Sequence, residues 1–145
     1  MLIGEYRSKV GEKKRVSLPN KLRKELGKNL ILTRGYEKSL VLVNKEMWES
    51  IAGEVVSGSF INKSIRDTSR FLIGSASEIN PDNQGRIVIP QGLYEYAELS
   101  KEAVFIGLVN WVEIWDKKNW KARLNYLKEH GDEIADELSK MSSKK

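Results

Sequence analysis

One short segment occurs twice in the sequence, and this repeat limits the possible folds more than any other feature. Residues 9–19 read KVGEKKRVSLP, and residues 80–90 read NPDNQGRIVIP. Arg15 and Arg86 occupy the same place in the two segments, 71 positions apart, and each segment ends in a proline. A chain that repeats a segment in this way is expected to fold as repeated structural units.

The similarity continues beyond the two prolines. Residues 15–26 align with residues 86–97 and, after one inserted residue, residues 29–48 align with residues 101–120. The duplication therefore covers roughly 45 residues in each copy. Solenoids usually need about three or more repeats, so two copies predict a pair of small units that share one core.

Each copy has the pattern of four short strands and two helices. Alternating apolar residues between polar turns place the expected strands at 5–10, from Arg15 toward Pro19, 30–33 and 40–43, and again at 76–79, from Arg86 toward Pro90, 103–107 and 111–115. Proline ends each second strand and favours the first turn of a short helix, expected at 20–26 and 91–97. Asn44 and Asp116 are good N-cap residues, so a further helix is expected after each.

Separate units of four short strands would have exposed edges. Packing the two units together removes those edges. The sequence therefore predicts an α+β, β-rich fold in which the units form a closed, pseudo-symmetric β-barrel with short helices. The expected boundaries are 5–48 for the first unit, 49–75 for a linker with a bridging helix, 76–120 for the second unit and 121–145 for a helical tail.

Apolar residues at helical spacing indicate the linker and tail helices. They are Ile61, Ile65 and Leu72 in the linker and Ile134, Leu138 and Met141 in the tail. The tail stripe is a candidate subunit contact rather than part of the core, and the last residues, SSKK, are expected to fray. Trp48 and Trp120 begin the apolar positions of the helices that follow each unit, and they are interpreted as core anchors rather than ligand-stacking platforms.

Charge is distributed unevenly along the chain. The net charge is +5, but residues 1–34 contain ten Lys or Arg against three Glu, which leaves the remaining residues slightly acidic. Such a basic region attracts polyanions, nucleic acid first and anionic lipid second, although a solvated lysine-rich face is an alternative reading. No apolar run is long enough to cross a bilayer, no secretory signal is seen, and there is no cysteine, so we expect a cytoplasmic protein.

The two arginines follow polar turns and have different neighbours. A guanidinium at such a turn can donate several hydrogen bonds to a carboxylate, a phosphate or a guanine edge. Asp82 stands four residues before Arg86 and is expected to pin it. The equivalent of Asp82 in the first copy is Gly11, which has no carboxylate, and lysines precede Arg15. Contact with phosphates or bases is therefore the favoured role of the first arginine.

Patterns typical of enzymes are weak in this sequence. His130 is the single histidine and lies near an expected helix end, where a surface or capping role is favoured over general base catalysis. Asp132, Glu133, Asp136 and Glu137 have helical spacing but lack a second ligand cluster, so a solvated face is favoured over a metal site. No phosphate-binding loop, dinucleotide fingerprint or nucleophile elbow occurs. We expect no enzymatic activity, no cofactor, no metal and no small-molecule substrate.

The paired segments, each with a polar turn, an arginine and an apolar run ending in proline, resemble the MraZ family of tandem SpoVT/AbrB-type domains. The opening GEY, the segment LILTRGYEKSLVLV and the segment GLVNWVEIWDKKNW support this resemblance, which extends to about Leu127. It implies a swapped-hairpin β-barrel fold and ring-like homo-oligomers. It also implies binding to short direct repeats in double-stranded promoter DNA upstream of the cell-division and cell-wall genes, usually as a repressor, and hence association with the nucleoid.

The first copy departs from the family pattern at two positions. Gly11 stands where the family has Asp, and Lys14 stands where it has Gly or Asn, so Lys14 has to accept any left-handed backbone that the turn requires. The second turn, DNQGR, fits the pattern fully. We therefore expect the first copy to supply the cationic contact surface and the second copy mainly to maintain the barrel and the ring.

The predicted site thus combines DNA contacts with turn-forming residues. The expected DNA contacts are Lys13, Lys14, Arg15, Arg86, Arg7, Lys9, Lys21, Arg23 and Lys24, and the turn residues are Asp82, Gly85, Pro19 and Pro90. The alternatives are an AbrB-like antitoxin whose tail from Asp132 covers a protein partner, and an oligomeric scaffold that binds nucleic acid without sequence preference. A membrane-surface role is less favoured, because the charges are interspersed among strand residues.

Overall fold

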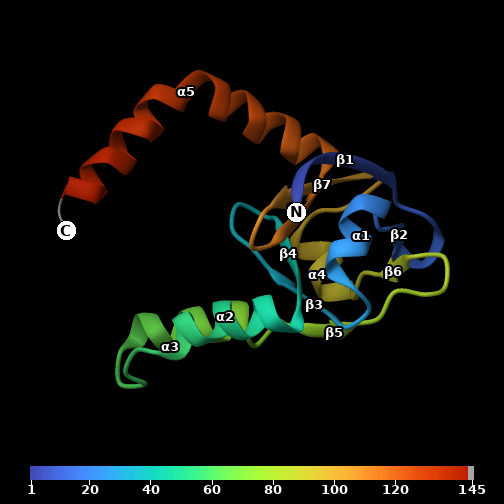
Figure 1. Ribbon diagram of the computed structural model, residues 1–145, viewed down its shortest axis with the longest axis horizontal. Helices are drawn as coiled ribbons and strands as arrows, with labels where there is room; N and C mark the ends of the chain where they lie inside the picture. The colour runs from blue at the N-terminus through green and yellow to red at the C-terminus, as the bar shows by residue number, and fades with distance from the viewer. Residues whose placement is uncertain (144–145) are drawn as a thin grey trace.

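Within residues 1–143, which the computed structural model describes, six strands form one antiparallel sheet in the order β1-β7-β8-β4-β3-β5 (Figure 1). The strands are β1 (Ile3–Lys9), β3 (Leu30–Arg34), β4 (Leu40–Asn44), β5 (Ser77–Ile79), β7 (Glu102–Leu108) and β8 (Val112–Asp116). The inner face is apolar because β-branched and leucine residues recur at every second position. The fold is therefore of the α+β class, as predicted.

Strands of the two copies are interleaved in this sheet. Strand β1 of the first copy pairs with β7 of the second, and β5 of the second copy pairs with β3 of the first. The fourth strands of the two copies, β4 and β8, pair with each other, with Val41 opposite Glu113 at the centre of their ladder. Each copy thus completes its sheet with strands of the other copy, which is consistent with two interleaved units.

The segments that contain the repeated arginines form a separate two-stranded ribbon of β2 (Arg15–Ser17) and β6 (Arg86–Val88). Val16 lies opposite Ile87, its counterpart in the other copy. The backbone N–H of Leu18 donates to the carbonyl of Gly85 at 2.9 Å, and the N–H of Ile89 donates to the carbonyl of Lys14 at 3.0 Å. These reciprocal bonds join equivalent positions, so the ribbon lies on the pseudo-two-fold axis that relates the copies.

The closed barrel predicted from the sequence is not found within residues 1–143. Strands β1 and β5 are the two edges of the sheet, and the ribbon is a second sheet. The reason is that β2 and β6 contain three residues each and use their hydrogen bonds on one another. A single bridge between Val10 and Val16 links the β1 side to the ribbon, so the ladder does not continue around a ring.

Two short helices cover the inner face of the sheet together with the ribbon. Helices α1 (Asn20–Leu26) and α4 (Gln91–Tyr96) each begin directly after a proline, as predicted. Burying one of their leucines stabilises the fold by about 1.5–3 kcal/mol. The main buried residues of this core are Val16, Leu18, Leu22, Leu26, Ile87, Ile89, Leu93 and Ala97 from the ribbon side, and Leu30, Leu32, Leu40, Leu42, Phe105, Val112 and Ile114 from the sheet.

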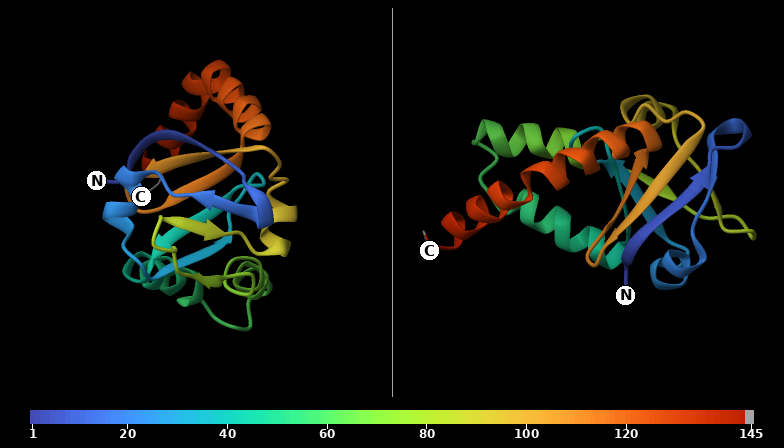
Figure 2. Two further views of the ribbon diagram at one scale, coloured as in Figure 1. Left: turned by 90° about the vertical axis from the view of Figure 1, so that its right-hand side faces the viewer. Right: turned by 90° about the horizontal axis from the view of Figure 1, so that it is seen from above.

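Three longer helices extend from the opposite side of the sheet (Figures 1 and 2). They are α2 (Lys45–Val56), α3 (Lys63–Leu72) and α5 (Lys117–Ser143). Asn44 caps α2 by accepting a hydrogen bond from the Met47 N–H at 2.9 Å, as its sequence position predicts. None of these helices, within the described part of the chain, combines the length and apolarity needed to span a bilayer.

The two tryptophans predicted as core anchors are both half-buried. Trp120 packs against a small apolar cluster of Val104, Ile106 and Trp115 under the start of α5. Its ring lies 5.4 Å from that of Trp115 in an edge-to-face arrangement. Trp120 is therefore an anchor of this second cluster rather than of the main core.

The tail is part of α5, which is one continuous helix from Lys117 through residue 143. Gly131 continues the helix, so the tail helix expected from the sequence is the C-terminal part of α5. Leu138 and Met141 are 63% and 67% exposed, so the tail stripe is free to contact another molecule. Fraying was predicted for residues 142–145. Ser142 and Ser143 still belong to α5, and residues 144–145 lie outside the described residues. Within the predicted linker, α3 lies where a bridging helix was expected, and the domain boundaries themselves stay a prediction.

Gly107 should be intolerant of a side chain. A Cβ at this position would lie 2.6 Å from the backbone nitrogen of Ile3 and 2.7 Å from the carbonyl carbon of Leu2. We expect Gly107→Ala to lower the free energy of unfolding by about 1–3 kcal/mol in urea titrations. The control is Gly53→Ala in α2, where nothing lies within 4 Å and alanine should stabilise the helix by about 0.5–1 kcal/mol. Equal effects of the two changes would contradict the close approach of β1 to Gly107.

Candidate nucleic-acid interface

The two arginine turns lie at one end of the molecule, and helices α2, α3 and α5 extend from the other end (Figure 1). The left panel of Figure 2 shows this end face-on, with the ribbon between α1 and α4. Both turns close with the same backbone hydrogen bond. The Gly11 N–H donates to the Arg15 carbonyl at 2.8 Å, and the Asp82 N–H donates to the Arg86 carbonyl at 2.9 Å. The repeat in sequence is therefore also a repeat in geometry.

The second turn is organised by the Asp82 carboxylate. One oxygen accepts hydrogen bonds from the backbone N–H groups of Gln84 and Arg86, each at 2.9 Å, and the other accepts from Arg86 Nε at 2.8 Å. The N–H of Arg86, then its guanidinium and the N–H of Gln84, lower the pKa of Asp82 below its ordinary value of 3.8. The structure thus confirms that Asp82 pins Arg86.

The first turn has the same closure without a carboxylate. It contains the short 3-10 segment η1 (Glu12–Lys14), in which Lys13 and Lys14 both have left-handed backbones with φ of 58° and 59°. Gly85, the counterpart of Lys14, has φ of 78°. The left-handed backbone that the sequence predicted for Lys14 is therefore confirmed. Lys14 Nζ lies 5.7 Å from the centre of the Tyr94 ring, a contact that the sequence analysis missed because it joins the two copies.

Arg15 differs from Arg86 in having an unpaired guanidinium. Among residues 1–143, no hydrogen bond or ion pair involves the Arg15 side chain. Strand alternation turns Val16 and Ile87 into the core, where each is 1% exposed, and turns Arg15 and Arg86 to the outer side of the ribbon. They are diagonal neighbours in the ladder, a position that places Cα atoms about 7–8 Å apart. This outer side, with Lys13 and Lys14 at its border, is called the ribbon surface below.

The cations of α1 do not all face solvent. Lys21 and Lys24 are exposed on the helix that flanks the ribbon. Arg23 is half-buried, and its Nη2 donates to the Asn83 carbonyl at 3.3 Å. Its guanidinium also covers Gly85, where a Cβ would lie 2.6 Å from Arg23 Nη1. Arg23 therefore positions the second turn, and no spacing in the sequence distinguishes it from its lysine neighbours.

Arg7 and Lys9 lie outside the ribbon surface. They are on β1, where Lys9 is directly opposite Glu102 and Arg7 is two positions away on the same face. Glu102 accepts a hydrogen bond from Lys117 at the start of α5, and this bond together with the charges of Arg7 and Lys9 lowers its pKa. These two predicted DNA contacts therefore lie on the face of the sheet where α5 begins, away from the ribbon surface.

His130 is held by contacts within its own helix. Its ring stacks on Tyr126 with centroids 4.2 Å apart, and its Nδ1 lies 2.9 Å from the Tyr126 carbonyl. In the described part of the chain, no group of three or more His, Asp or Glu residues is placed to hold a metal ion. The polar residues brought together most clearly are therefore those of the two turns.

The fold and the site define a class of protein: two interleaved copies of a strand-turn-strand unit that present a cationic surface at one end of the molecule. The family model of the MraZ protein, which is described as antitoxin-like, matches residues 1–71 and again residues 72–141. The chain therefore belongs to the MraZ family.

Similar proteins named Transcriptional regulator MraZ occur in several bacteria. The one from Acetivibrio thermocellus is 41% identical over 122 residues, covering 84% of this chain and 85% of the relative. The one from Halothermothrix orenii is 39% identical over 135 residues, covering 93% and 94%. The one from Clostridium tetani is 36% identical over 145 residues, covering 97% and 99%. The similarity thus extends over both copies of the repeat.

Replacing Lys14 with glycine should stabilise the protein. The change Lys14→Gly removes the steric cost of a left-handed backbone, which glycine adopts without a Cβ clash. This gain in free energy is larger than the cost of the extra backbone entropy that glycine has in the unfolded chain. We expect the free energy of unfolding to rise by about 0.5–1 kcal/mol in urea titrations. Lys24→Gly in α1, where the backbone is helical, is the control and should be destabilising. A less stable Lys14→Gly protein would show that the contact with Tyr94 outweighs the strain.

The stabilising effect of Asp82 should disappear in acid. Because folding lowers the pKa of Asp82, its ionised form stabilises the folded state above pH about 4, and this stabilisation is lost as the pH falls through the lowered pKa. Asp82→Asn keeps the acceptor for the two backbone N–H groups but loses the charge. The variant should be less stable than wild type at pH 7, and the difference should shrink as the pH falls below about 4. A difference that stays constant with pH would contradict an ionic role.

Proposed function

We propose that this protein binds double-stranded DNA sequence-specifically and regulates transcription, acting as a repressor. The observation that carries the proposal is the unpaired guanidinium of Arg15, which stands beside Lys13 and Lys14 on the ribbon surface. The shared name of the relatives, Transcriptional regulator MraZ, supports the regulatory role. The proposed targets are short direct repeats in the promoter of the cell-division and cell-wall genes, so the protein would work in the cytoplasm at the nucleoid.

The chemistry of the ribbon surface suits a nucleic acid. Lysine side chains neutralise phosphates and release counterions, which makes binding strong at low salt and weaker as salt rises. A guanidinium can donate two hydrogen bonds to a guanine edge, a contact that discriminates by about 1–3 kcal/mol. Arg15 has the geometry for this role because its donors are not used inside the protein. Lys21 and Lys24 on α1 would add contacts with the DNA backbone beside the ribbon.

A single protomer offers few such contacts, so we propose that a ring-like homo-oligomer binds several spaced repeats at once. Once one protomer is bound, the others act at a high effective concentration, and affinity increases without any new type of contact. The exposed tail stripe of α5 is a candidate for the protein contact that holds neighbouring protomers together.

The second copy would support this surface rather than read DNA. The guanidinium of Arg86 is engaged by Asp82, and Arg23 packs over the same turn. This geometry fixes the position of β6, and β6 in turn fixes β2 through the ribbon ladder. The proposed division of labour thus assigns contact to the first turn and positioning to the second.

The antitoxin-like description of the family favours one alternative. In that role the exposed apolar residues of the tail, Ile134, Leu138 and Met141, would cover a protein partner. Co-purification of a defined partner that is lost when the tail from Asp132 is deleted would support this function. A third possible function is an oligomeric scaffold that binds nucleic acid without sequence preference. Comparing binding to the promoter repeats with binding to a scrambled duplex distinguishes it from the proposed function.

The decisive experiment is a fluorescence-anisotropy titration of the whole protein on two duplexes. One carries several spaced copies of the direct repeat from its own promoter, and the other has a scrambled sequence. We expect tight binding to the repeats alone, with log K decreasing against log salt by about 0.9 for each phosphate contact. Equal and weak binding to both duplexes would contradict sequence-specific binding. It would show that the cationic surface binds polyanions without specificity.

The two arginines should differ in the same assay. Arg15→Ala should weaken binding to the repeats by about tenfold or more, because it removes a direct contact. Arg86→Ala should change affinity by less than about threefold, and it should lower thermal stability because Asp82 loses its partner. Size-exclusion chromatography is the control that shows whether both variants keep the wild-type assembly. Comparable losses of affinity in two correctly assembled variants would refute the division of labour.

A further inference from the structure

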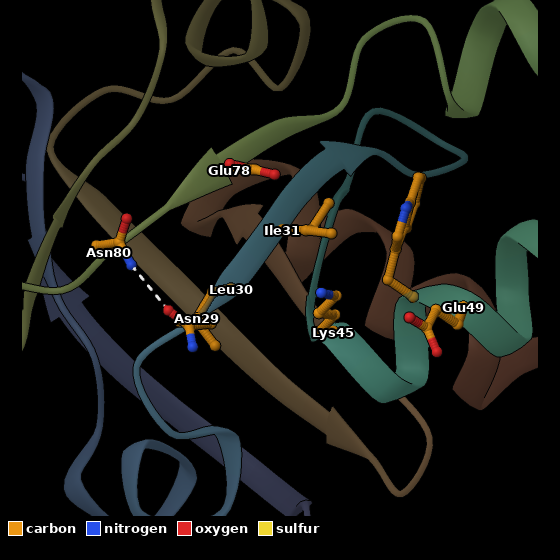
Figure 3. A pocket seen from close by; sticks show the side chains of 8 residues that line it. Asn29, Leu30, Ile31, Lys45, Glu49, Glu78 and Asn80 are labelled. Carbon is orange, nitrogen blue, oxygen red and sulfur yellow. Dashed lines mark hydrogen bonds between the residues drawn. The ribbon is translucent and has the colours of Figure 1, made fainter.

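Two hollows open on the outer side of the sheet, one on each side of Trp48. The larger, about 400 Å³, lies between the start of α2 and strand β5 (Figure 3). Lys45, Glu49 and Glu78 surround it, and all three are exposed to solvent. Charges of both signs in contact with water give this hollow no clear preference for a ligand.

The second hollow has a different lining. It measures about 220 Å³ and lies between the sheet and helices α2 and α3. Its wall is mainly apolar and aromatic, with side chains from the sheet, both helices and the turn between β7 and β8. The principal ones are Tyr36, Val41, Trp48, Ile51, Leu72 and Trp111. We call this hollow the tryptophan cavity.

Two polar side chains in the wall of the tryptophan cavity, those of Glu113 and Thr33, are already bonded within the protein. The two oxygens of Glu113 accept hydrogen bonds from the indole N–H groups of Trp111 at 3.0 Å and Trp115 at 2.9 Å. The hydroxyl of Thr33 is bonded to the Leu72 carbonyl and lies 2.9 Å from the Ser75 hydroxyl. An anion would be repelled by Glu113, and a cation would find both carboxylate oxygens already accepting hydrogen bonds. Either ion would lose water on entering, and this loss costs free energy. The cavity therefore favours an uncharged ligand.

We propose that the tryptophan cavity binds a small, flat, uncharged aromatic molecule of about the size of indole. An apolar protein cavity of about 150 Å³ is large enough for benzene, so the tryptophan cavity has room for a second fused ring. Tyr36, Trp48 and Trp111 offer aromatic surfaces for edge-to-face or offset contacts. Ile51 and Leu72 supply the aliphatic remainder of the wall.

The position of the cavity gives such a ligand a mechanical effect. Val41 belongs to the sheet, Ile51 belongs to α2, and Leu72 ends α3, which leads directly into β5. A bound ring would contact all three and hold the α2–α3 pair against the sheet. Helices α2 and α3, which form one wall of the cavity, extend from the end of the molecule opposite the arginine turns (Figure 1), so the site is separate from the proposed DNA contacts.

The test is a fluorine NMR titration of a monofluorinated indole with the full-length protein in its native assembly and without DNA. Ile51→Trp fills the cavity, and Ile31→Trp is the matched control. Ile31 is another half-buried isoleucine, and it lines the neighbouring hollow instead. We expect saturable line broadening with wild type and with Ile31→Trp, and binding at least about tenfold weaker with Ile51→Trp. Fluorinated tryptophan, which has the same ring with a charged head group, should show no saturable binding.

A second measurement on the wild type does not depend on whether the variant folds. Nuclear Overhauser contacts from the bound ligand should reach the indole protons of Trp48 and Trp111. The proposal is overturned if wild type shows no saturable binding, if a folded Ile51→Trp binds as well as wild type, or if the ligand contacts neither tryptophan. Because DNA is absent from the assay, failure of the proposed regulatory function would leave this result unchanged.

Discussion

The structure depends on one constraint: the first two strands of each copy have their ladders with strands of the other copy. Strand β1 has its ladder with β7, β5 has its ladder with β3, and the ribbon pairs β2 with β6. Either copy alone would expose a row of unpaired backbone groups along several short strands. The shared core strengthens this dependence, because Val16 and Ile87 meet at the centre of the ribbon and are both buried. Formation of the cationic end and folding of the sheet are therefore one event.

The same closure in the two turns has different chemical consequences. Both turns join the first and fifth residues by a backbone hydrogen bond, so their shape does not depend on the side chains alone. In the second turn, Asp82 and Gly85 agree with that shape, since one supplies acceptors and the other tolerates a left-handed backbone. In the first turn, two lysines adopt left-handed backbones. This conformation costs free energy and persists only because the surrounding structure fixes it. The first turn thus gives up local stability and gains unpaired positive charge.

The order of strands and helices followed from the sequence because periodicity, prolines and helix caps agree between two copies. The failure of barrel closure did not follow, because strand length decides whether a ladder continues, and a three-residue strand looks the same in sequence as the start of a longer one. The role of Asp82 was predictable from its spacing to Arg86. The roles of Arg23 and Arg7 were not, because each depends on a neighbour from the other copy: the Asn83 carbonyl for Arg23, and Glu102 for Arg7.

The interleaving of the copies within one chain also has an evolutionary consequence. If the same unit existed as a separate polypeptide, it would complete its sheet by pairing with an identical molecule, and every mutation would appear twice in the assembly. A change that opened one turn would open both, and the assembly would lose its pinned turn. Covalent fusion removes this restriction, because each copy then mutates alone. Gly11 and Asp82 differ in this way: the first position has no carboxylate, and its counterpart has the carboxylate that holds the shared ribbon in place.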